Sequence, residues 1–339
     1  MRYVLGVDGG ATKTMAVVGD ETGKVLGIGH GGPTNYQITG LDTAMKHLDD
    51  AVGSALSQAS LSVGDIRLAV FGMAGADYPI DFEELTKGIS GLYPGMKFTL
   101  TNDTWVGFRA GTDKEYGGVV ISGTGANFAA ASPDGRKITG RGMGYEWGSE
   151  GGAGSLIREI MHYAFRSHDG TGPKTGLEDA VLRLLEFQSY DELSYYMYRM
   201  RGEFARMYMK AAALVPALFE LAFSGDEVSQ DILIRNGKAM GEIIGGLMAR
   251  LGMQRIPVDV VLVGSIFTKG VCPLLVSALR TACQRHVPLA EFRLVEMEPA
   301  CGALILALEE LGVPAKGAVR QKVIETFSKY EPVPTEKSC

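Results

Sequence analysis

The sequence contains few cysteines, and none of them lies among its first 271 residues. The four cysteines are Cys272, Cys283, Cys301 and Cys339, and no two of them form a C-x-x-C pair. A disulfide framework is therefore not expected. The five histidines lack the i, i+4 spacing of a zinc site on a helix, so we interpret them as surface or core residues.

Long apolar runs and an excess of basic residues are also missing. No run reaches the roughly 18 apolar residues that a membrane span requires. The longest candidate, 211–223, is interrupted by Pro216 and Glu220, so we expect no membrane contact. The net charge of −6 and the lack of a basic stripe argue against a nucleic-acid partner. Because a strand pattern starts with the first residues, we expect no signal peptide and a cytoplasmic location.

The composition is otherwise that of an ordinary globular protein. Of the 339 residues, 46% are hydrophobic and 21% are charged. This length exceeds what one hydrophobic core usually supports, so we expect two domains. We place the first domain at 1–115, joined by a C-terminal helix at about 300–325, and the second, with a helical insertion, at 116–299. Residues 328–339 show no periodicity and predict a flexible tail.

The hydrophobic pattern predicts an α/β order of elements. In the first domain this order is β-β-β-α-β-α-β, and helix 42–59 has apolar residues at the period of one buried face. In the second domain the theme restarts after Gly117, and 258–263 is almost continuously apolar, as in a strand buried on both faces. The predicted strands are 3–7, 14–18, 25–29, 66–71, 97–101, 119–122, 128–131 and 258–263, and the predicted helices are 42–59, 82–89, 226–251 and 301–311.

The strongest chemical signal lies between the first two predicted strands and reads Asp8-Gly9-Gly10-Ala11-Thr12-Lys13-Thr14. Glycines let backbone N–H groups approach phosphate oxygens, and the side chains of Thr12, Lys13 and Thr14 add donors. A P-loop needs glycine directly before its lysine and a helix after it, whereas here Thr12 precedes Lys13 and a strand follows. We interpret the stretch as a phosphate-binding hairpin. The alternative is a glycine-rich turn without a ligand.

Two further glycine elements follow the ends of predicted strands. The turn Gly123-Thr124-Gly125, with Asn127 shortly after it, can form a second N–H cradle for phosphate. Gly264 and Ser265 end the strand 258–263, where a glycine would let an adenine or a ribose pack against the backbone. Each element is a weak signal alone, and the second of them is by itself also explained as a core strand with a glycine turn.

The order of these three elements over about 260 residues resembles the superfamily of sugar kinases, hexokinase, heat-shock protein 70 and actin. Within it, the chain resembles the BadF/BadG/BcrA/BcrD ATPase family, to which the N-acetylglucosamine kinases belong, over almost its whole length. Supporting blocks are Gly31–Tyr36, Gly72–Ala76, Thr101–Asp103, Gly140–Gly144 and Trp147–Gly151. The resemblance implies an α/β fold of two ribonuclease H-like domains with ATP in the cleft between them. It also implies a kinase that transfers the γ-phosphate of ATP to a hydroxyl of a sugar or amino sugar.

The resemblance assigns roles to single residues as well. Asp8 would orient Mg²⁺, and Asp103 would face the substrate as the general base that phosphoryl transfer needs. The alternative for Asp103 is an N-cap of the helix that follows it. Asn35 matches a sugar-contacting asparagine, and its alternative is a turn residue after Pro33. The residues expected to contact ATP are Gly9, Gly10, Thr12, Lys13, Thr14, Gly123, Thr124, Gly125, Gly264 and Ser265.

Residues 140–154 include seven glycines, too many for the interior of a helix or strand, and we interpret them as a substrate-side loop. The Gly-Asp-Glu-Gly of the family reads Gly148-Ser149-Glu150-Gly151 here, so that Ser149 replaces a sugar-facing aspartate. Glu146 or Glu150 is the candidate for the missing carboxylate. The expected substrate contacts are Asn35, Asp103, Asn127, Gly144, Glu146, Ser149 and Glu150.

Two other functions occur among proteins of this kind. One is an ATPase that drives electron transfer into a radical dehydratase or reductase through a cluster shared by two subunits, with cysteines in mid-chain. The lack of cysteine before Cys272 argues against it. The other is a repressor-type sugar sensor, and the presence of Asp103 and the absence of a helix-turn-helix pattern before the first strand argue against it. Because many relatives pair through the second domain, we expect a homodimer.

Overall fold

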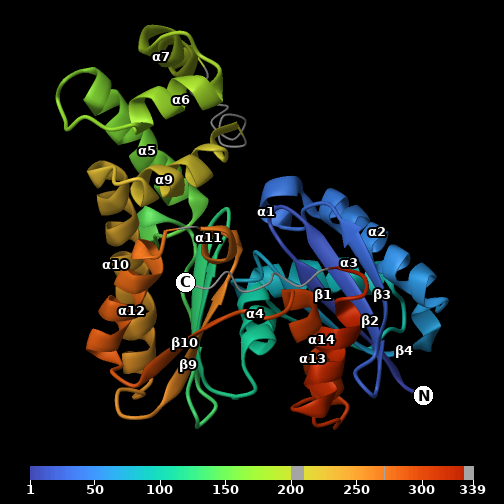
Figure 1. Ribbon diagram of the computed structural model, residues 1–339. Helices are drawn as coiled ribbons and strands as arrows, with labels where there is room; N and C mark the ends of the chain where they lie inside the picture. Colours follow the sequence, from blue (N-terminus) through green and yellow to red (C-terminus); the bar gives the residue numbers. More distant parts are fainter. Residues whose placement is uncertain (200–209, 271, 332–339) are drawn as a thin grey trace. The chain divides into compact units, whose positions relative to one another are not determined.

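The computed structural model of the chain describes residues 1–199, 210–270 and 272–331. The chain divides into two compact units, which are described separately here (Figure 1). Unit 1 comprises the described residues of Met1–Val119, Asp259–Val263 and Arg293–Ser338, and unit 2 those of Val120–Val258 and Gly264–Phe292. The domain bounds expected from the sequence stay a prediction. Most of the predicted tail 328–339, from residue 332 on, lies outside the described residues.

Unit 1 contains a five-stranded mixed sheet with the order β3-β2-β1-β4-β5, which confirms the predicted strands. The neighbours β1, β2 and β3 pair antiparallel, whereas β1, β4 and β5 pair parallel. The parallel registers place Asp8 opposite Gly72 and Met73 opposite Asn102, so the carboxyl ends of three strands meet at one edge. The strands are β1 (Tyr3–Gly9), β2 (Thr14–Asp20), β3 (Val25–Gly31), β4 (Ile66–Met73) and β5 (Phe98–Asn102).

Helices cover both faces of this sheet, because successive side chains of a strand point to opposite faces. The helices of unit 1 are α1 (Tyr36–Thr39), α2 (Leu41–Ala59), α3 (Pro79–Leu92), α4 (Asp103–Gly111), α13 (Pro299–Glu310) and α14 (Ala318–Phe327), with a 3₁₀ turn at Val63–Asp65. In β1, Val4 packs in the core that includes α13 and α14, whereas Leu5 packs in the core that includes α2 and α3.

Glycines let these helices approach the strand backbone closely. On β3, a Cβ added at Gly27, Gly29 or Gly31 would lie 2.0 to 2.3 Å from a carbonyl oxygen of α2. On β1, a Cβ at Gly6 would lie 2.2 Å from the backbone nitrogen of Leu304 in α13. No larger residue fits at these distances, so the packing of both helix layers depends on the absence of side chains.

The second sheet has the order β10-β9-β6-β7-β8. Within it β7 pairs antiparallel with β8, and every residue of β9 is buried, as its apolar run predicts. The strands are β6 (Gly117–Ser122), β7 (Ala126–Ala131), β8 (Lys137–Thr139), β9 (Val258–Val263) and β10 (Ala290–Leu294).

The helices of unit 2 include the long helix that the sequence predicts at 226–251. This helix, α10, packs closely on α12: a Cβ at Gly237 or Gly241 would lie 2.1 or 2.2 Å from a carbonyl oxygen of α12.

Among the described residues, no helix combines the length and the apolar character needed to cross a membrane. The helices are α5 (Ala153–His168), α6 (Leu177–Leu185), α7 (Tyr190–Arg199), α9 (Leu214–Phe223), α10 (Glu227–Arg250), α11 (Ser265–Lys269) and α12 (Leu274–His286), with a 3₁₀ turn at Tyr145–Trp147.

The close approach of α13 to β1 predicts that Gly6→Ala is destabilising. The new methyl group would overlap the α13 backbone, which cannot move away as a flexible side chain could. Overpacking of this kind typically costs about 1–3 kcal/mol, seen as a lower urea midpoint of unfolding. Gly53→Ala is the control, because a Cβ at this exposed position of α2 meets nothing within 4 Å and alanine favours the helix. An unchanged midpoint for Gly6→Ala would show that α13 does not press on β1.

Candidate functional site

The hairpin between β1 and β2 presents unpaired backbone N–H groups. The Gly10 N–H donates to the Lys13 carbonyl at 2.9 Å, and the Gly10 carbonyl accepts from the Thr34 N–H at 3.0 Å. The N–H groups of Ala11, Thr12 and Lys13 have no hydrogen-bond partner among the described residues. Adjacent free N–H groups in a turn favour an anion, in agreement with the phosphate-binding interpretation of this motif.

Gly9 and Thr14 join this hairpin to the loop that follows β3. The Thr14 hydroxyl is fully buried and donates to the Gly32 carbonyl at 2.8 Å, with the Thr34 hydroxyl 3.0 Å away. A Cβ at Gly9 would lie 2.5 Å from the Thr34 hydroxyl oxygen. Gly9 and Thr14 thus both pack against the loop that follows β3. The contact of Gly9, Gly10 and Thr14 with ATP stays a prediction. Thr12 and Lys13 are exposed at the tip, where their side chains are open to a ligand.

Asp103 is the first residue of α4 and not its N-cap. The cap is Asn102, whose side-chain oxygen accepts from the Thr104 N–H at 3.0 Å, so the alternative interpretation of Asp103 as a cap is wrong. The Oδ1 atom of Asp103 is buried and has no hydrogen-bond partner among the described residues. Burial, and next the charge of Asp77, raises the pKa of Asp103 to about 7.

The carboxylates of Asp8 and Asp103 interact at this edge of the sheet. Burial, and next the charges of Asp103 and Glu298, raises the pKa of Asp8 to about 8, while Lys13 acts in the opposite direction. The Lys13 ammonium lies 3.4 Å from a carboxylate oxygen of Glu298, the N-cap residue of α13. Buried carboxylates that repel one another favour the uptake of a cation or a proton. Sequence reasoning missed Glu298, because this residue lies near the other end of the chain and belongs to no recognisable motif.

Asn35 lies next to the turn that follows β4. Its side-chain oxygen accepts from the Gln37 N–H at 3.1 Å and caps α1. Gly75, whose φ of 84° suits glycine, leaves room for this asparagine, since a Cβ there would lie 2.9 Å from the Asn35 oxygen. Asn35 is therefore a turn residue, as its alternative interpretation states. Its side-chain NH₂ group has no partner among the described residues, and the sugar contact stays a prediction.

The hairpin between β6 and β7 in unit 2 also presents free N–H groups. The Gly123 N–H donates to the Gly125 carbonyl at 2.9 Å, whereas the N–H groups of Thr124 and Gly125 have no partner in the described part of the chain. The Ala153 N–H, at the start of α5, donates to the Gly123 carbonyl at 2.8 Å and supports the turn. A Cβ at Gly123 or Gly125 would meet nothing within 4 Å, so a ligand has room here.

Gly264 lies against the start of this second hairpin. Its φ is 110°, and a Cβ there would lie 2.3 Å from the Ser122 carbonyl oxygen. The backbone approach alone requires glycine, whether or not a nucleoside packs beside it. Ser265 is exposed and begins α11. The nucleotide contacts expected of Gly264 and Ser265 stay predictions.

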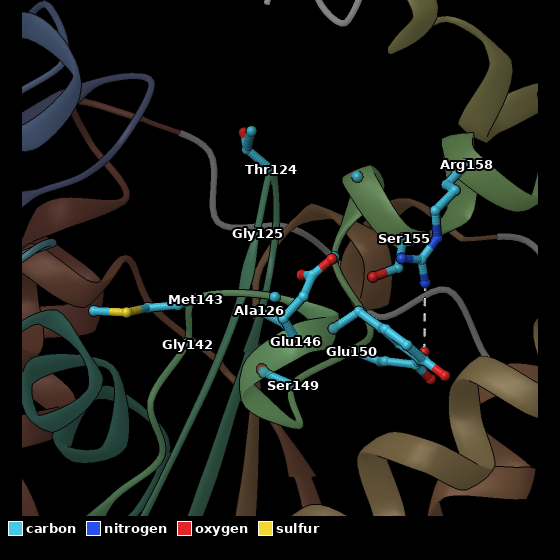
Figure 2. Close-up of a pocket in the computed structure, with 14 residues that line it drawn as sticks. Thr124, Gly125, Ala126, Gly142, Met143, Glu146, Ser149, Glu150, Ser155 and Arg158 are labelled. Carbon is cyan, nitrogen blue, oxygen red and sulfur yellow. Dashed lines mark hydrogen bonds and ion pairs between the residues drawn. The ribbon is translucent and has the colours of Figure 1, made fainter.

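A cavity of about 310 Å³ adjoins the second hairpin (Figure 2). Thr124 and Gly125 line it from the hairpin, and the loop 142–152 and the first turns of α5 complete the wall. Four loop glycines have φ between 63° and 114°, a backbone region that favours glycine, which explains the glycine content of the segment. The cavity brings together the predicted substrate residues Gly144, Glu146, Ser149 and Glu150. Asn127 does not line it and instead accepts a hydrogen bond from the Phe128 N–H at 2.8 Å.

Charged and aromatic side chains give this cavity its chemistry. Arg158, from α5, lies 3.5 Å from the Glu150 carboxylate and 4.8 Å from the centre of the Tyr145 ring. Glu146 has no hydrogen bond or ion pair within the described ranges, and Ser149 is only 5% exposed. Figure 2 shows Glu146 and Glu150 at the same cavity, with Arg158 reaching toward Glu150. Sequence reasoning missed Arg158, because only the fold brings the side chain of this α5 residue to the loop, and it passed over Tyr145, which lies within the loop that it singled out.

A family model described as the BadF/BadG/BcrA/BcrD ATPase family matches residues 5–307. The chain belongs to this family. The N-acetyl-D-glucosamine kinase of Dictyostelium discoideum is 27% identical to it over 316 residues, which cover 90% of this chain and 97% of that protein. The N-acetylmuramic acid/N-acetylglucosamine kinase of Clostridium acetobutylicum is 27% identical over 310 residues, which cover 91% and 99%.

Solved structures show that this family member has the α/β fold of actin-like ATPases, which confirms the predicted fold class. A ROK family glucokinase from Streptomyces griseus, in complex with glucose and AMPPNP, matches with a TM-score of 0.57 and 16% identity, covering 91% of this chain and 98% of that chain. The ROK hexokinase from Thermus thermophilus matches with a TM-score of 0.56 and 19% identity, covering 92% and 99%.

The raised pKa of Asp103 predicts how stability depends on pH without ligands. A carboxyl group with a higher pKa in the folded protein binds more protons there, so stability falls as pH rises from the ordinary pKa of 3.8 to about 7. Asp103→Asn cannot ionise and should therefore flatten this decline in urea midpoints measured with EDTA. Asp50→Asn, which removes an exposed carboxylate of α2, should keep the wild-type slope. Equal slopes for wild type and Asp103→Asn would contradict the pKa assignment.

Proposed function

We propose that this protein is an ATP-dependent kinase that transfers the γ-phosphate of ATP to a hydroxyl group of a sugar or amino sugar. The observation that carries the proposal is the buried, unpartnered carboxylate oxygen of Asp103, in a chain whose curated relatives are named N-acetylglucosamine kinases. A capping or ion-paired aspartate would have its oxygens satisfied. A free carboxylate with a pKa of about 7 is suited to accept a proton near neutral pH.

Each hairpin by itself is suited to bind phosphate oxygens of ATP. Ala11, Thr12 and Lys13 in the first hairpin, and Thr124 and Gly125 in the second, offer free N–H groups. Such groups bind phosphate oxygens at fixed positions without the cost of ordering a side chain. The Lys13 ammonium would add a positive charge once it leaves Glu298.

Asp8 fits a single carboxylate ligand of Mg²⁺. Within the described residues, no group of three or more His, Cys, Asp or Glu side chains could hold a metal by itself. Mg²⁺ commonly binds one or two carboxylates and completes its shell with phosphate oxygens and water. A cation would also offset the effects of burial and of the neighbouring carboxylates, which raise the pKa of Asp8. When bound, Mg²⁺ supplies charge neutralisation at the phosphate oxygens.

Asp103 acts as the general base in this proposal. The acceptor hydroxyl donates its hydrogen bond to the free carboxylate oxygen, and its proton moves to Asp103 as the acceptor oxygen bonds to the γ-phosphorus. The bond from this phosphorus to the bridging oxygen breaks, and ADP leaves. Because such transfer depends mainly on positioning, the hairpin N–H groups contribute by holding the phosphates in line.

The substrate side of the proposal uses Asn35, Glu146, Ser149 and Glu150. Glutamate side chains accept hydrogen bonds from sugar hydroxyls, and the Tyr145 ring offers an apolar surface for a sugar ring. We also expect a homodimer in the cytoplasm. Sedimentation that shows only monomer at micromolar concentration would contradict the dimer without affecting the kinase assignment.

The redox-activator alternative has less support. The described cysteines Cys272, Cys283 and Cys301 are all buried. Burial raises the pKa of Cys283 to about 12 and also raises the pKa of Cys301. Buried thiols with a raised pKa, such as those of Cys283 and Cys301, are poor ligands for a cluster shared between subunits.

Asp103→Asn should retain the fold and ATP binding but lower kcat about 10²- to 10⁴-fold, the usual loss when a general base is removed. Asparagine keeps the size of the side chain but cannot accept the proton. The measurement is ADP release with a panel of sugars, and Asp50→Asn again serves as the exposed control. Activity near that of the wild type would remove Asp103 from the mechanism.

Ser149→Asp should lower KM for the sugar. A carboxylate in place of the hydroxyl restores a charge-assisted hydrogen bond, typically about 1.5–3 kcal/mol or tenfold to a hundredfold in affinity. Ser149→Asn is the matched control, because it adds similar volume without charge. KM is measured for N-acetylglucosamine, glucosamine and glucose. If all three values stay as in the wild type, Ser149 does not face the sugar.

A further inference from the structure

Asn102 uses both ends of its side-chain amide at the start of α4. Its oxygen accepts from the N–H and the hydroxyl of Thr104 at 3.0 and 2.6 Å. Its NH₂ group donates to the Asp77 carboxylate at 2.9 Å and to the Ala76 carbonyl at 3.2 Å. The residue is 5% exposed, so these bonds are made away from solvent. Asn102 therefore links the turn after β4 to the first turn of α4.

Asp77, together with the Ala76 carbonyl and the Thr104 N–H, fixes which way round this amide lies. The two ends of an asparagine amide have nearly the same shape, but only the oxygen can cap a helix. An ionised carboxylate has no hydrogen to donate, so opposite Asp77 only the NH₂ end of Asn102 is favourable. If the amide turned over, its NH₂ group would oppose the Thr104 N–H, and α4 would lose its cap.

The carboxylate at position 77 is also costly for stability. Burial, and next the charge of Asp81, raises the pKa of Asp77. A neutral hydrogen-bond acceptor at position 77 would bind Asn102 without the free-energy cost of burying a charge. A charged group at such a place suggests a role beyond packing.

We infer that Asp77 is a positioning residue: through Asn102 it holds the first turn of α4 and so directs the carboxylate of Asp103 toward the acceptor hydroxyl. Asp103 stands between Asn102 and Thr104, the two residues that the cap joins. The inference rests on the proposed role of Asp103 as general base.

A double-mutant cycle tests this role. Asp77→Ala removes the carboxylate acceptor and leaves only the Ala76 carbonyl. Asn102→Ser keeps an N-cap residue but cannot hold Asp77 as the amide does. Each should lower kcat roughly tenfold to a hundredfold, the effect of a small displacement of a reacting group, with KM for ATP and sugar near the wild-type values. The double variant should lose no more than either single one, because both break one link. Asp77→Asn keeps an acceptor oxygen but loses the charge and can also donate, so its kcat should lie between those of the wild type and Asp77→Ala. Asp50→Ala is the surface control.

Hydrogen exchange of the Thr104 amide gives a readout that does not need activity. Its N–H is bonded to Asn102, so we expect slow exchange in the wild type and in Asp77→Asn, and exchange at least about tenfold faster in Asp77→Ala. An unchanged kcat in Asp77→Ala, additive losses in the double variant, or unchanged exchange would overturn the inference. Asn102→Ser and Asp77→Asn decide the matter if Asp77→Ala does not fold. If the wild type phosphorylates no sugar, the proposed function fails, while the exchange data still test the link.

Discussion

The parallel pairing of β1 with β4 and of β4 with β5 is the constraint on which the candidate site of unit 1 depends. Parallel strands end at the same edge of a sheet, so residues that are far apart in the chain become neighbours there. Asp8 at the end of β1 and Asp103 just after β5 meet in this way. The hairpin N–H groups and the turns after β3 and β4 complete the same edge.

Placing several carboxylates at one edge of the sheet destabilises the folded protein electrostatically. Burial, and next the charges of Asp103 and Glu298, raises the pKa of Asp8 to about 8, and burial, and next the charge of Asp77, raises the pKa of Asp103 to about 7. A protein without a ligand at this edge gains nothing from the arrangement, since protonated or apolar residues would be more stable. A cation beside Asp8 and a hydroxyl beside Asp103 would offset the cost, which is why the geometry supports phosphoryl transfer. Perturbed pKa values of this kind are typical of functional sites.

Unit 2 forms its candidate site mainly from backbone groups and glycines. Its hairpin after β6 and its glycine-rich loop have few side chains, and glycines at positive φ give the loop its course. The side chains that remain in the cavity include Glu146, Ser149 and Arg158. In the proposed function they would contact the sugar. In the proposed function, Ser149 in place of an aspartate would leave the choice of sugar to these groups.

Local patterns were sufficient to predict eight of the ten described strands and the two longest described helices, α2 and α10. Period-2 and period-3.6 apolar patterns depend on neighbours in the chain, so β1 to β5, β9 and α10 lie where the sequence places them. The glycine motifs at both hairpins were recognisable for the same reason, because a turn is a local structure. Several shorter elements, such as α1 and β8, carry too few residues for a pattern and were not predicted.

The sequence by itself thus determined the order of elements, the two hairpins and the family resemblance that singled out Asp8 and Asp103. Only the tertiary structure decided that Asn102 caps α4 in place of Asp103. It alone brought Glu298 and Asp77 near these carboxylates, and it turned the Thr14 hydroxyl toward the protein. The physical reason is that hydrogen bonding, burial and charge act through space. These interactions join groups whose separation along the chain carries no information about their distance in the fold.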